Sequence, residues 1–211
     1  MGNRNIKAIV SILREDVGTS WAVVWDTNPF KVLISTVLSQ RTKDANTEKA
    51  SNRLFRRFKT PKQLANANIR TIETLIKPSG FYKVKAERIR EISRQLVEKF
   101  GGTVPEDMDT LLSLPGVGRK TANCVLVYAY NKPAIPVDTH VHRISNRIGW
   151  VRTRTPEQTE QQLSNVLPRE YWIEINELLV KYGQRVCHPI NPKCSTCRIR
   201  KYCTYGRKQR I

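Results

Sequence analysis

The chain has no run of about 18 apolar residues, which is the length that a membrane-spanning helix needs. Residues 1–7 also lack the apolar core of a secretory signal. Asn5 and Ile6 do not supply the serine or threonine of a myristoylation motif. These absences predict an intracellular protein without a membrane partner, in the cytoplasm or nucleoid, or in the nucleus of a eukaryote.

Acidic residues are scarce. Only 18 Asp and Glu accompany 37 Lys and Arg, which gives a formal net charge of +19 at pH 7. Such an excess attracts polyanions, so nucleic acid is the favoured partner. A ribosomal protein or a protein of anionic membranes would share the charge. Against a membrane, the basic residues are spread along the chain and no isolated amphipathic segment carries them.

Cysteine is almost confined to the end of the chain. Cys124 lies alone in an apolar segment, where it fits a core thiol. In an intracellular chain, a cluster of the remaining cysteines indicates a metal site before it indicates disulfides. The cluster has the spacing Cys-x6-Cys-x2-Cys-x5-Cys and consists of Cys187, Cys194, Cys197 and Cys203.

Zinc and an iron–sulfur centre both accept four thiolates. A zinc ribbon typically has two Cys-x2-Cys knuckles, and here only Cys194 and Cys197 form one. A [4Fe–4S] centre accepts looser, uneven loops, so the spacing favours iron–sulfur over zinc. Nearby cations, among them Lys193 and Arg198, either offset the charge of the cluster or contact phosphates.

Strand signals are missing as well. Apolar residues recur at helical spacing almost throughout, and the apolar stretch 32–38, which is rich in β-branched residues, has no neighbouring segment as a strand partner. A chain of 211 residues can bury one sizeable core or two small lobes. We therefore predict an all-α architecture with short connections. The clearest expected helices cover residues 4–18, 30–39, 45–58, 68–77, 83–100, 141–148 and 157–166.

The stretch 114–123 reads Leu-Pro-Gly-Val-Gly-Arg-Lys-Thr-Ala-Asn. Pro115 ends the helix before it, while Gly116 and Gly118 permit backbone dihedrals that other residues resist. This pattern predicts a helix, a tight hairpin and a second helix. The N–H groups and the dipole at the start of that second helix suit a phosphate, although an ordinary helix–helix turn has the same glycines.

Lys120 falls in the first turn of the second helix. The positive end of the helix dipole and the neighbouring Arg119 both favour the neutral, nucleophilic form of its amine, which can form an imine. A surface lysine that meets a phosphate is the alternative. Asp138 follows the apolar Val137 at the start of another helix. It either caps that helix or stabilises positive charge on a sugar and assists proton transfer.

Three motifs in order resemble the endonuclease III family: residues 114–122, the run Val-Asp-Thr-His-Val-x-Arg at 137–143, and the cysteine spacing. The resemblance extends from about residue 6 to residue 205. It implies a two-lobed helix-hairpin-helix glycosylase fold with a DNA cleft between the lobes. A six-helix barrel would span 22–132, and the other lobe would join 1–21 to 133–211 and hold a [4Fe–4S] cluster at 187–203.

The resemblance also implies a monomeric, bifunctional DNA glycosylase and abasic-site lyase of base excision repair. Such an enzyme flips an oxidised or ring-saturated pyrimidine out of double-stranded DNA and breaks the N-glycosidic bond. It then nicks the strand by β-elimination. By motif match, Lys120 would be the Schiff-base nucleophile and Asp138 its carboxylate partner.

Two loops of the family fill the space that the flipped base leaves. Where the family has a glutamine, this chain has Arg41, with Gln40 one place earlier, so either of the two would read the orphan base. Phe81 stands where a leucine is common. The remaining residues that we assign to DNA contact are Gly116, Gly118, Arg119, His140, Arg143, Lys193 and Arg198.

Two rival functions remain. A monofunctional glycosylase for mispaired or alkylated bases would use an activated water, but such relatives generally lack the lysine, so Lys120 argues against it. A non-catalytic iron–sulfur DNA-binding protein would explain the charge, the glycines and the cysteines. It would leave Lys120 and Asp138 without a role.

Overall fold

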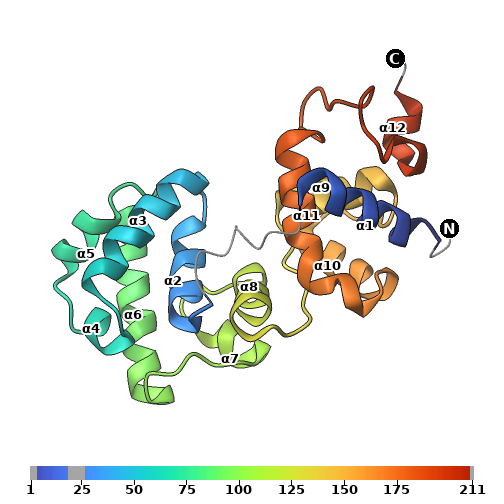
Figure 1. Cartoon of the computed structure of the whole chain (residues 1–211). Helices are drawn as coiled ribbons and strands as arrows, with labels where there is room; N and C mark the ends of the chain where they lie inside the picture. Colours follow the sequence, from blue (N-terminus) through green and yellow to red (C-terminus); the bar gives the residue numbers. More distant parts are fainter. Residues whose placement is uncertain (1–3, 19–26, 210–211) are drawn as a thin grey trace. The chain divides into compact units, whose positions relative to one another are not determined.

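A computed structural model describes residues 4–18 and 27–209. Every regular element in these two ranges is a helix, which confirms the all-α prediction (Figure 1). No helix in the same ranges combines the length and the apolar character needed to cross a bilayer. The elements are α1 (Arg4–Val17), α2 (Pro29–Ser39), α3 (Asp44–Arg57), α4 (Pro61–Ala65), α5 (Ile69–Ile76), α6 (Tyr82–Phe100), α7 (Met108–Ser113), α8 (Arg119–Tyr130), α9 (Thr139–Ile148), α10 (Pro156–Val166), η1 (Arg169–Tyr171), α11 (Trp172–Arg185), η2 (Arg200–Tyr202) and α12 (Thr204–Lys208).

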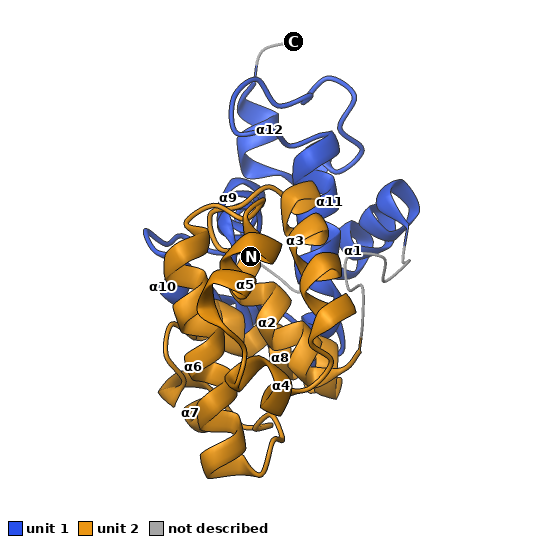
Figure 2. Ribbon diagram, turned by 90° about the vertical axis from the view of Figure 1, so that its left-hand side faces the viewer, with its two compact units in different colours: residues 1–23, 133–211 blue, residues 24–132 orange. Residues whose placement is uncertain are grey.

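Contacts between Cα atoms divide the chain into two compact units (Figure 2). The central unit is residues 24–132, and the terminal unit joins residues 1–23 to 133–211. The lobe boundary that we expected between residues 21 and 22 lies outside the described residues. Each unit contains its own set of buried apolar side chains.

The core of the central unit forms around α2. The side chain of Asn28 caps this helix by accepting from the N–H of Lys31 at 3.1 Å, and Pro29 suits its first turn. The helix is apolar on nearly every side, so it packs against α3, α6 and α8 rather than facing water. Its buried side chains are Phe30, Val32, Leu33, Ile34, Val37 and Leu38.

The terminal unit packs α1 and α9 against α11, with α10 and α12 also against α9. Apolar side chains of α1, α9, α10 and α11 share one core cluster with Tyr171, and Tyr205 of α12 packs against it. A bidentate ion pair joins Arg14 of α1 to Glu174 of α11, with N–O distances of 2.6 and 2.9 Å. The N-terminal helix is thereby fixed to the part of the chain that carries the cysteines.

The hairpin between α7 and α8 has the form that the sequence predicts. Its turn closes where the N–H of Val117 donates to the carbonyl of Leu114 at 3.1 Å. Gly116 has φ of +72°, and a Cβ added there would lie 2.1 Å from Nε of Arg88. Its backbone conformation therefore favours glycine, and a side chain there would have to displace the side chain of Arg88.

The conformational prediction for Gly118 is wrong. Its φ of −95° and ψ of 174° are extended backbone that any residue adopts, and no atom lies within 4 Å of a Cβ added there. Gly118 is the N-cap of α8, and it contributes no side-chain oxygen to that position. Gly116 thus allows the left-handed backbone conformation of the turn, whereas Gly118 is an extended N-cap residue.

This difference gives a matched pair of substitutions. We expect Gly116→Ala to lower the free energy of unfolding by about 1–3 kcal/mol, because alanine strains the backbone there and Arg88 must move. Gly118→Ala should cost less, about 0.5–1 kcal/mol, because alanine is a poorer N-cap than glycine but the extended backbone there accepts a side chain without strain. Denaturant titrations of both variants measure the effect, and equal losses would contradict this account of the hairpin.

Candidate functional site

Lys120 and Arg119 are both exposed in the first turn of α8, directly after the hairpin. Six other α-helices begin with a side chain of Asn, Thr or Asp that accepts a bond from the first turn. At α8 the corresponding residue is Gly118, which has no side chain. The start of α8 therefore resembles the helix ends that bind a phosphate through backbone N–H groups.

Gln40 is the C-cap residue of α2, and its side chain is fully engaged within the central unit. Its Nε2 donates to the carbonyl of Gly116 at 3.1 Å and to the hydroxyl of Thr121 at 3.3 Å. Its Oε1 accepts from the guanidinium of Arg88 at 3.2 Å. Gln40 therefore joins the loop after α2 to the hairpin, and Arg88 supports both of them.

Arg41 and Phe81 lie on two neighbouring loops of the central unit. The guanidinium carbon of Arg41 is 6.0 Å from the centroid of the Phe81 ring. Both residues are exposed, with Phe81 at 64%, and both adopt positive φ, at +52° and +57° respectively. Non-glycine residues seldom adopt this conformation, and those that do are concentrated at functional sites.

Asp138 caps α9 in the terminal unit. Its Oδ1 accepts from the backbone N–H groups of His140 at 2.9 Å and Val141 at 2.8 Å. The carboxylate is half-buried, and its second oxygen, Oδ2, takes no part in these two bonds. Asp138 is thus the helix cap that the sequence allowed, and the capping bonds use only Oδ1 of its carboxylate.

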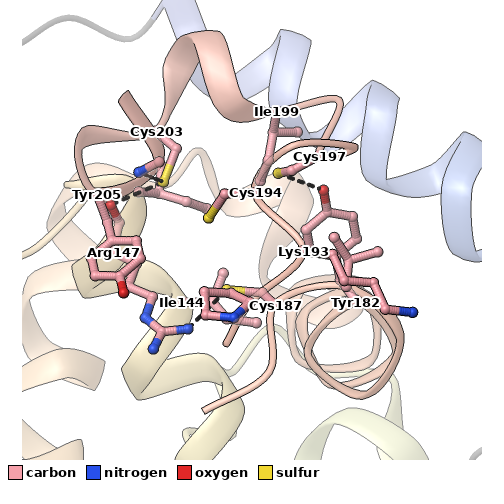
Figure 3. A pocket seen from close by; sticks show the side chains of 14 residues that line it. Ile144, Arg147, Tyr182, Cys187, Lys193, Cys194, Cys197, Ile199, Cys203 and Tyr205 are labelled. Carbon is pink, nitrogen blue, oxygen red and sulfur yellow. Dashed lines mark hydrogen bonds between the residues drawn. The ribbon is translucent and has the colours of Figure 1, made fainter. Parts of the chain in front are cut away.

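The four clustered cysteines line one pocket in the terminal unit (Figure 3). Apolar side chains, among them Ile144, Ile148 and Ile199, form much of the remaining wall. In Figure 3 the four cysteine side chains are spread around the pocket. Within residues 4–18 and 27–209, no three His, Cys, Asp or Glu side chains are grouped closely enough to hold one metal ion.

Three polar groups of the protein lie against these sulfurs, and two of them, the N–H of Gly206 and the guanidinium of Arg147, are donors. The buried hydroxyl of Tyr182 lies 3.1 Å from Sγ of Cys197. The backbone N–H of Gly206 donates to Sγ of Cys203 at 3.3 Å, and the guanidinium of Arg147 lies 3.4 Å from Sγ of Cys187. Donors of this kind stabilise sulfur in its negatively charged, ligating form.

Arg147 has a larger role that the sequence did not reveal. Besides the sulfur, it donates to the carbonyls of His188 at 2.6 Å and Pro189 at 2.7 Å, and it lies over the ring of Tyr205. It therefore shapes the long loop between the first two cysteines. Its only sequence signal is its place in α9, four residues after Arg143.

Several cations that we assigned to DNA contact have protein partners. Arg143 is half-buried and donates to the carbonyl of Cys187 at 2.9 Å and to that of Thr139 at 3.3 Å. Burial lowers its pKa. The ring Nδ1 of His140 lies 3.1 Å from the same guanidinium. Arg143 thus ties α9 to the cysteine loop, and its contact with DNA stays a prediction.

Arg198 pairs with Asp16 and Glu15 of α1, each at 2.7 Å. Lys193 is exposed beside the second cysteine. Of these two cations of the cysteine loop, Arg198 is bound to α1 and Lys193 is exposed to solvent. Their contact with DNA also stays a prediction.

Comparison with known proteins identifies the family. The family model described as HhH-GPD superfamily base excision DNA repair protein matches residues 34–169. Endonuclease III of Thermotoga maritima is 58% identical over 184 residues, covering 87% of this chain and 86% of that protein. Endonuclease III of Escherichia coli K12 is 38% identical over 181 residues, covering 86% of each chain.

Solved structures agree with these matches. A trapped endonuclease III–DNA covalent intermediate has a TM-score of 0.91 and 33% identity, covering 99% of this chain and 98% of that one. A thermostable thymine-DNA glycosylase has a TM-score of 0.87 and 26% identity, covering 98% and 99% respectively. The fold is thus common to endonuclease III and a thymine-DNA glycosylase. The chain belongs to the endonuclease III family, within the HhH-GPD superfamily of base excision DNA repair proteins.

Proposed function

We propose that this chain removes oxidised pyrimidines from double-stranded DNA and cleaves the resulting abasic site through a Schiff base on Lys120. As a member of the endonuclease III family, it is a DNA N-glycosylase and abasic-site lyase. One observation carries the proposed chemistry. Lys120 is an exposed amine in the first turn of α8, immediately after a hairpin whose helix end suits a phosphate.

The reaction follows from a neutral amine held beside the sugar of a flipped nucleotide. Nζ of Lys120 forms a bond to C1′ as the bond from C1′ to the base breaks, and the base leaves with the electron pair. Opening of the sugar ring then gives an imine. Loss of a proton from C2′ expels the 3′ phosphate and nicks the strand, and water finally releases the lysine.

Asp138 would stabilise the positive charge that develops on the sugar during this reaction. Both capping bonds go to Oδ1, so Oδ2 would face the positively charged sugar while the cap of α9 stays intact. Lys120 belongs to the central unit and Asp138 to the terminal unit. The proposal therefore requires that both reach one sugar when DNA is bound.

Arg41, rather than Gln40, would enter the space left by the flipped base. Three hydrogen bonds already hold the Gln40 side chain against the hairpin and Arg88. Arg41 is exposed beside the exposed ring of Phe81. An arginine can donate to the orphan base and stack on it, and an aromatic ring can replace the stacking that the flipped base has lost.

The cysteine pocket fits a [4Fe–4S] cluster better than a single zinc ion. Zinc needs four sulfurs at about 2.3 Å from one point, whereas the four thiols here are spread around a pocket (Figure 3). Cys187, Cys194, Cys197 and Cys203 would hold the cluster, with Arg147 and Tyr182 donating to their sulfurs. Once bound, the cluster supplies a rigid link that holds the loop 187–203 in one shape.

The two units would contribute different parts of the active site. The central unit would contribute the nucleophile and the gap-filling loops, and the terminal unit the carboxylate and the cluster. The protein would act as an intracellular monomer on double-stranded DNA with damaged bases or abasic sites. A monofunctional mismatch glycosylase is the rival reading, and it differs by forming no covalent intermediate.

The role of Lys120 is tested by reductive trapping. We expect borohydride to link the wild-type chain covalently to lesion-containing duplex and Lys120→Ala to give no adduct, because the amine that forms the imine is gone. Lys99→Ala, which removes an exposed lysine from the last turn of α6, is the matched control and should trap like wild type. An adduct with Lys120→Ala would disprove the assignment.

The role of Asp138 is tested by removing its charge while keeping its cap. Asparagine caps helices as well as aspartate does, so Asp138→Asn should melt close to wild type. Its rate of base release should fall by about 10²- to 10⁴-fold.

Asp107 supplies the control for this substitution. It caps α7 through the N–H of Thr110 at 2.9 Å, and Asp107→Asn makes the same chemical change. Asp107→Asn should retain full activity. An active Asp138→Asn enzyme would reduce Asp138 to a structural cap.

Metal analysis tests the cluster. We expect about four iron atoms per chain together with visible absorbance, and loss of both in Cys197→Ser, because serine is a poor ligand for iron in such clusters. Cys124→Ala is the control, since Cys124 is buried in α8 of the central unit and should not affect iron content. One zinc per chain and no iron would overturn the assignment.

A further inference from the structure

A buried ammonium group lies between the two loops that carry Arg41 and Phe81. Lys85 is in the first turn of α6 and is only 3% exposed. Its Nζ donates to the carbonyls of Leu38 at 2.7 Å and Gln40 at 2.5 Å, at the end of α2. It also donates to the hydroxyls of Thr42 and Ser79, each at 2.9 Å.

All four acceptors are neutral. Burying a cation without a carboxylate is unfavourable, and burial, with Arg88 nearby, lowers the pKa of Lys85 to about 8. One compensation is that the carbonyl of Leu38 lies in the last turn of α2, where the helix dipole favours a positive charge. The ammonium of Lys85 therefore binds backbone carbonyls at the C-terminal end of α2.

The same four acceptors belong to both loops. Leu38, Gln40 and Thr42 come from the end of α2 and the loop after it, and Ser79 comes from the loop before α6. The loops also bind each other directly. The N–H of Gly80 donates to Oγ1 of Thr42 at 3.0 Å, and the hydroxyl of Ser79 donates to the carbonyl of Leu38 at 2.9 Å.

The two loops that this network joins each contain a residue other than glycine with positive φ. Arg41 and Phe81 are the residues of each loop that adopt the left-handed region without being glycine. Such a conformation persists only where the surroundings fix it, and Lys85 supplies direct bonds to Gln40 and Thr42, the residues on either side of Arg41. The four acceptors share the three N–H donors of the ammonium, and an apolar side chain in its place would offer them none.

We propose that Lys85 is a positioning residue that locks Arg41 and Phe81 into one preformed surface for the gap in the duplex. This inference rests on the proposed function, in which these two side chains fill the space of the flipped base. A surface held by one buried cation does not need to order itself on binding, so that less of the binding energy is spent on ordering. Lys85 itself touches no DNA.

The test compares a substrate with a gap to fill and one without. One substrate is a duplex with a ring-saturated thymine, and the other is a single-stranded oligonucleotide with an abasic site and no opposite base. Single-turnover trapping with borohydride measures the rate on each. In Lys85→Met we expect the rate on the duplex to fall about 10- to 100-fold and the rate on the single strand to stay within about twofold.

Two further variants serve as a matched control and as a second test of the network around Lys85. Lys99→Met makes the same change at an exposed position of α6 and should leave both rates unchanged. Thr42→Val removes one acceptor of Lys85 and the bond to Gly80 but keeps the ammonium. It should show the same selective loss on the duplex, smaller in size, and it decides the question if Lys85→Met does not fold.

An optical readout reports on the gap itself. With 2-aminopurine opposite the lesion, wild-type binding should raise the fluorescence as the orphan base unstacks, and Lys85→Met should raise it less. Equal losses of rate on both substrates, or no loss on either, would overturn the positioning role. Failure of the wild-type enzyme to form any adduct would instead refute the proposed function, so the two failures are distinct.

Discussion

The buried position of α2 is the constraint on which the central unit depends. Because this helix is apolar on nearly every side, it is fixed by the core, and so is the place where it ends. Three features of the candidate site begin at that end. Gln40 reaches the hairpin, Lys85 binds the last carbonyls, and Arg41 leaves the helix with positive φ. Core packing thereby determines where polar side chains are presented.

Helix caps explain why two similar helix starts differ in function. At α9 the cap is Asp138, whose Oδ1 accepts from the first turn, so that this helix end carries its own anion. At α8 the residue is Gly118, which adds no oxygen. The positive end of α8 is therefore the one suited to an external anion such as a phosphate. Lys120 lies in the first turn of α8, directly beside this helix end.

Sequence patterns predicted the helices, Gly116 and the cysteine cluster because each has a local signal. Periodicity gives the helices, a hairpin needs a positive φ, and ligand spacing is visible directly. Gly118 was misjudged because a glycine N-cap and a glycine in the left-handed region look alike in sequence. Lys85, Arg88 and Arg147 were missed for another reason. In a chain with 37 Lys and Arg, no local pattern separates a buried cation from a solvated one.

The same distinction changes what the charge of +19 means for DNA binding. Affinity for DNA and its dependence on salt follow the number of phosphates that cations neutralise, not the net charge. Lys85 and Arg147 are already bound to protein acceptors, and Arg198 is paired with carboxylates of α1. Fewer cations than the total therefore remain for phosphates, and Lys193 is an exposed one. Part of the positive charge that suggests a nucleic-acid partner is thus used in contacts within the protein itself.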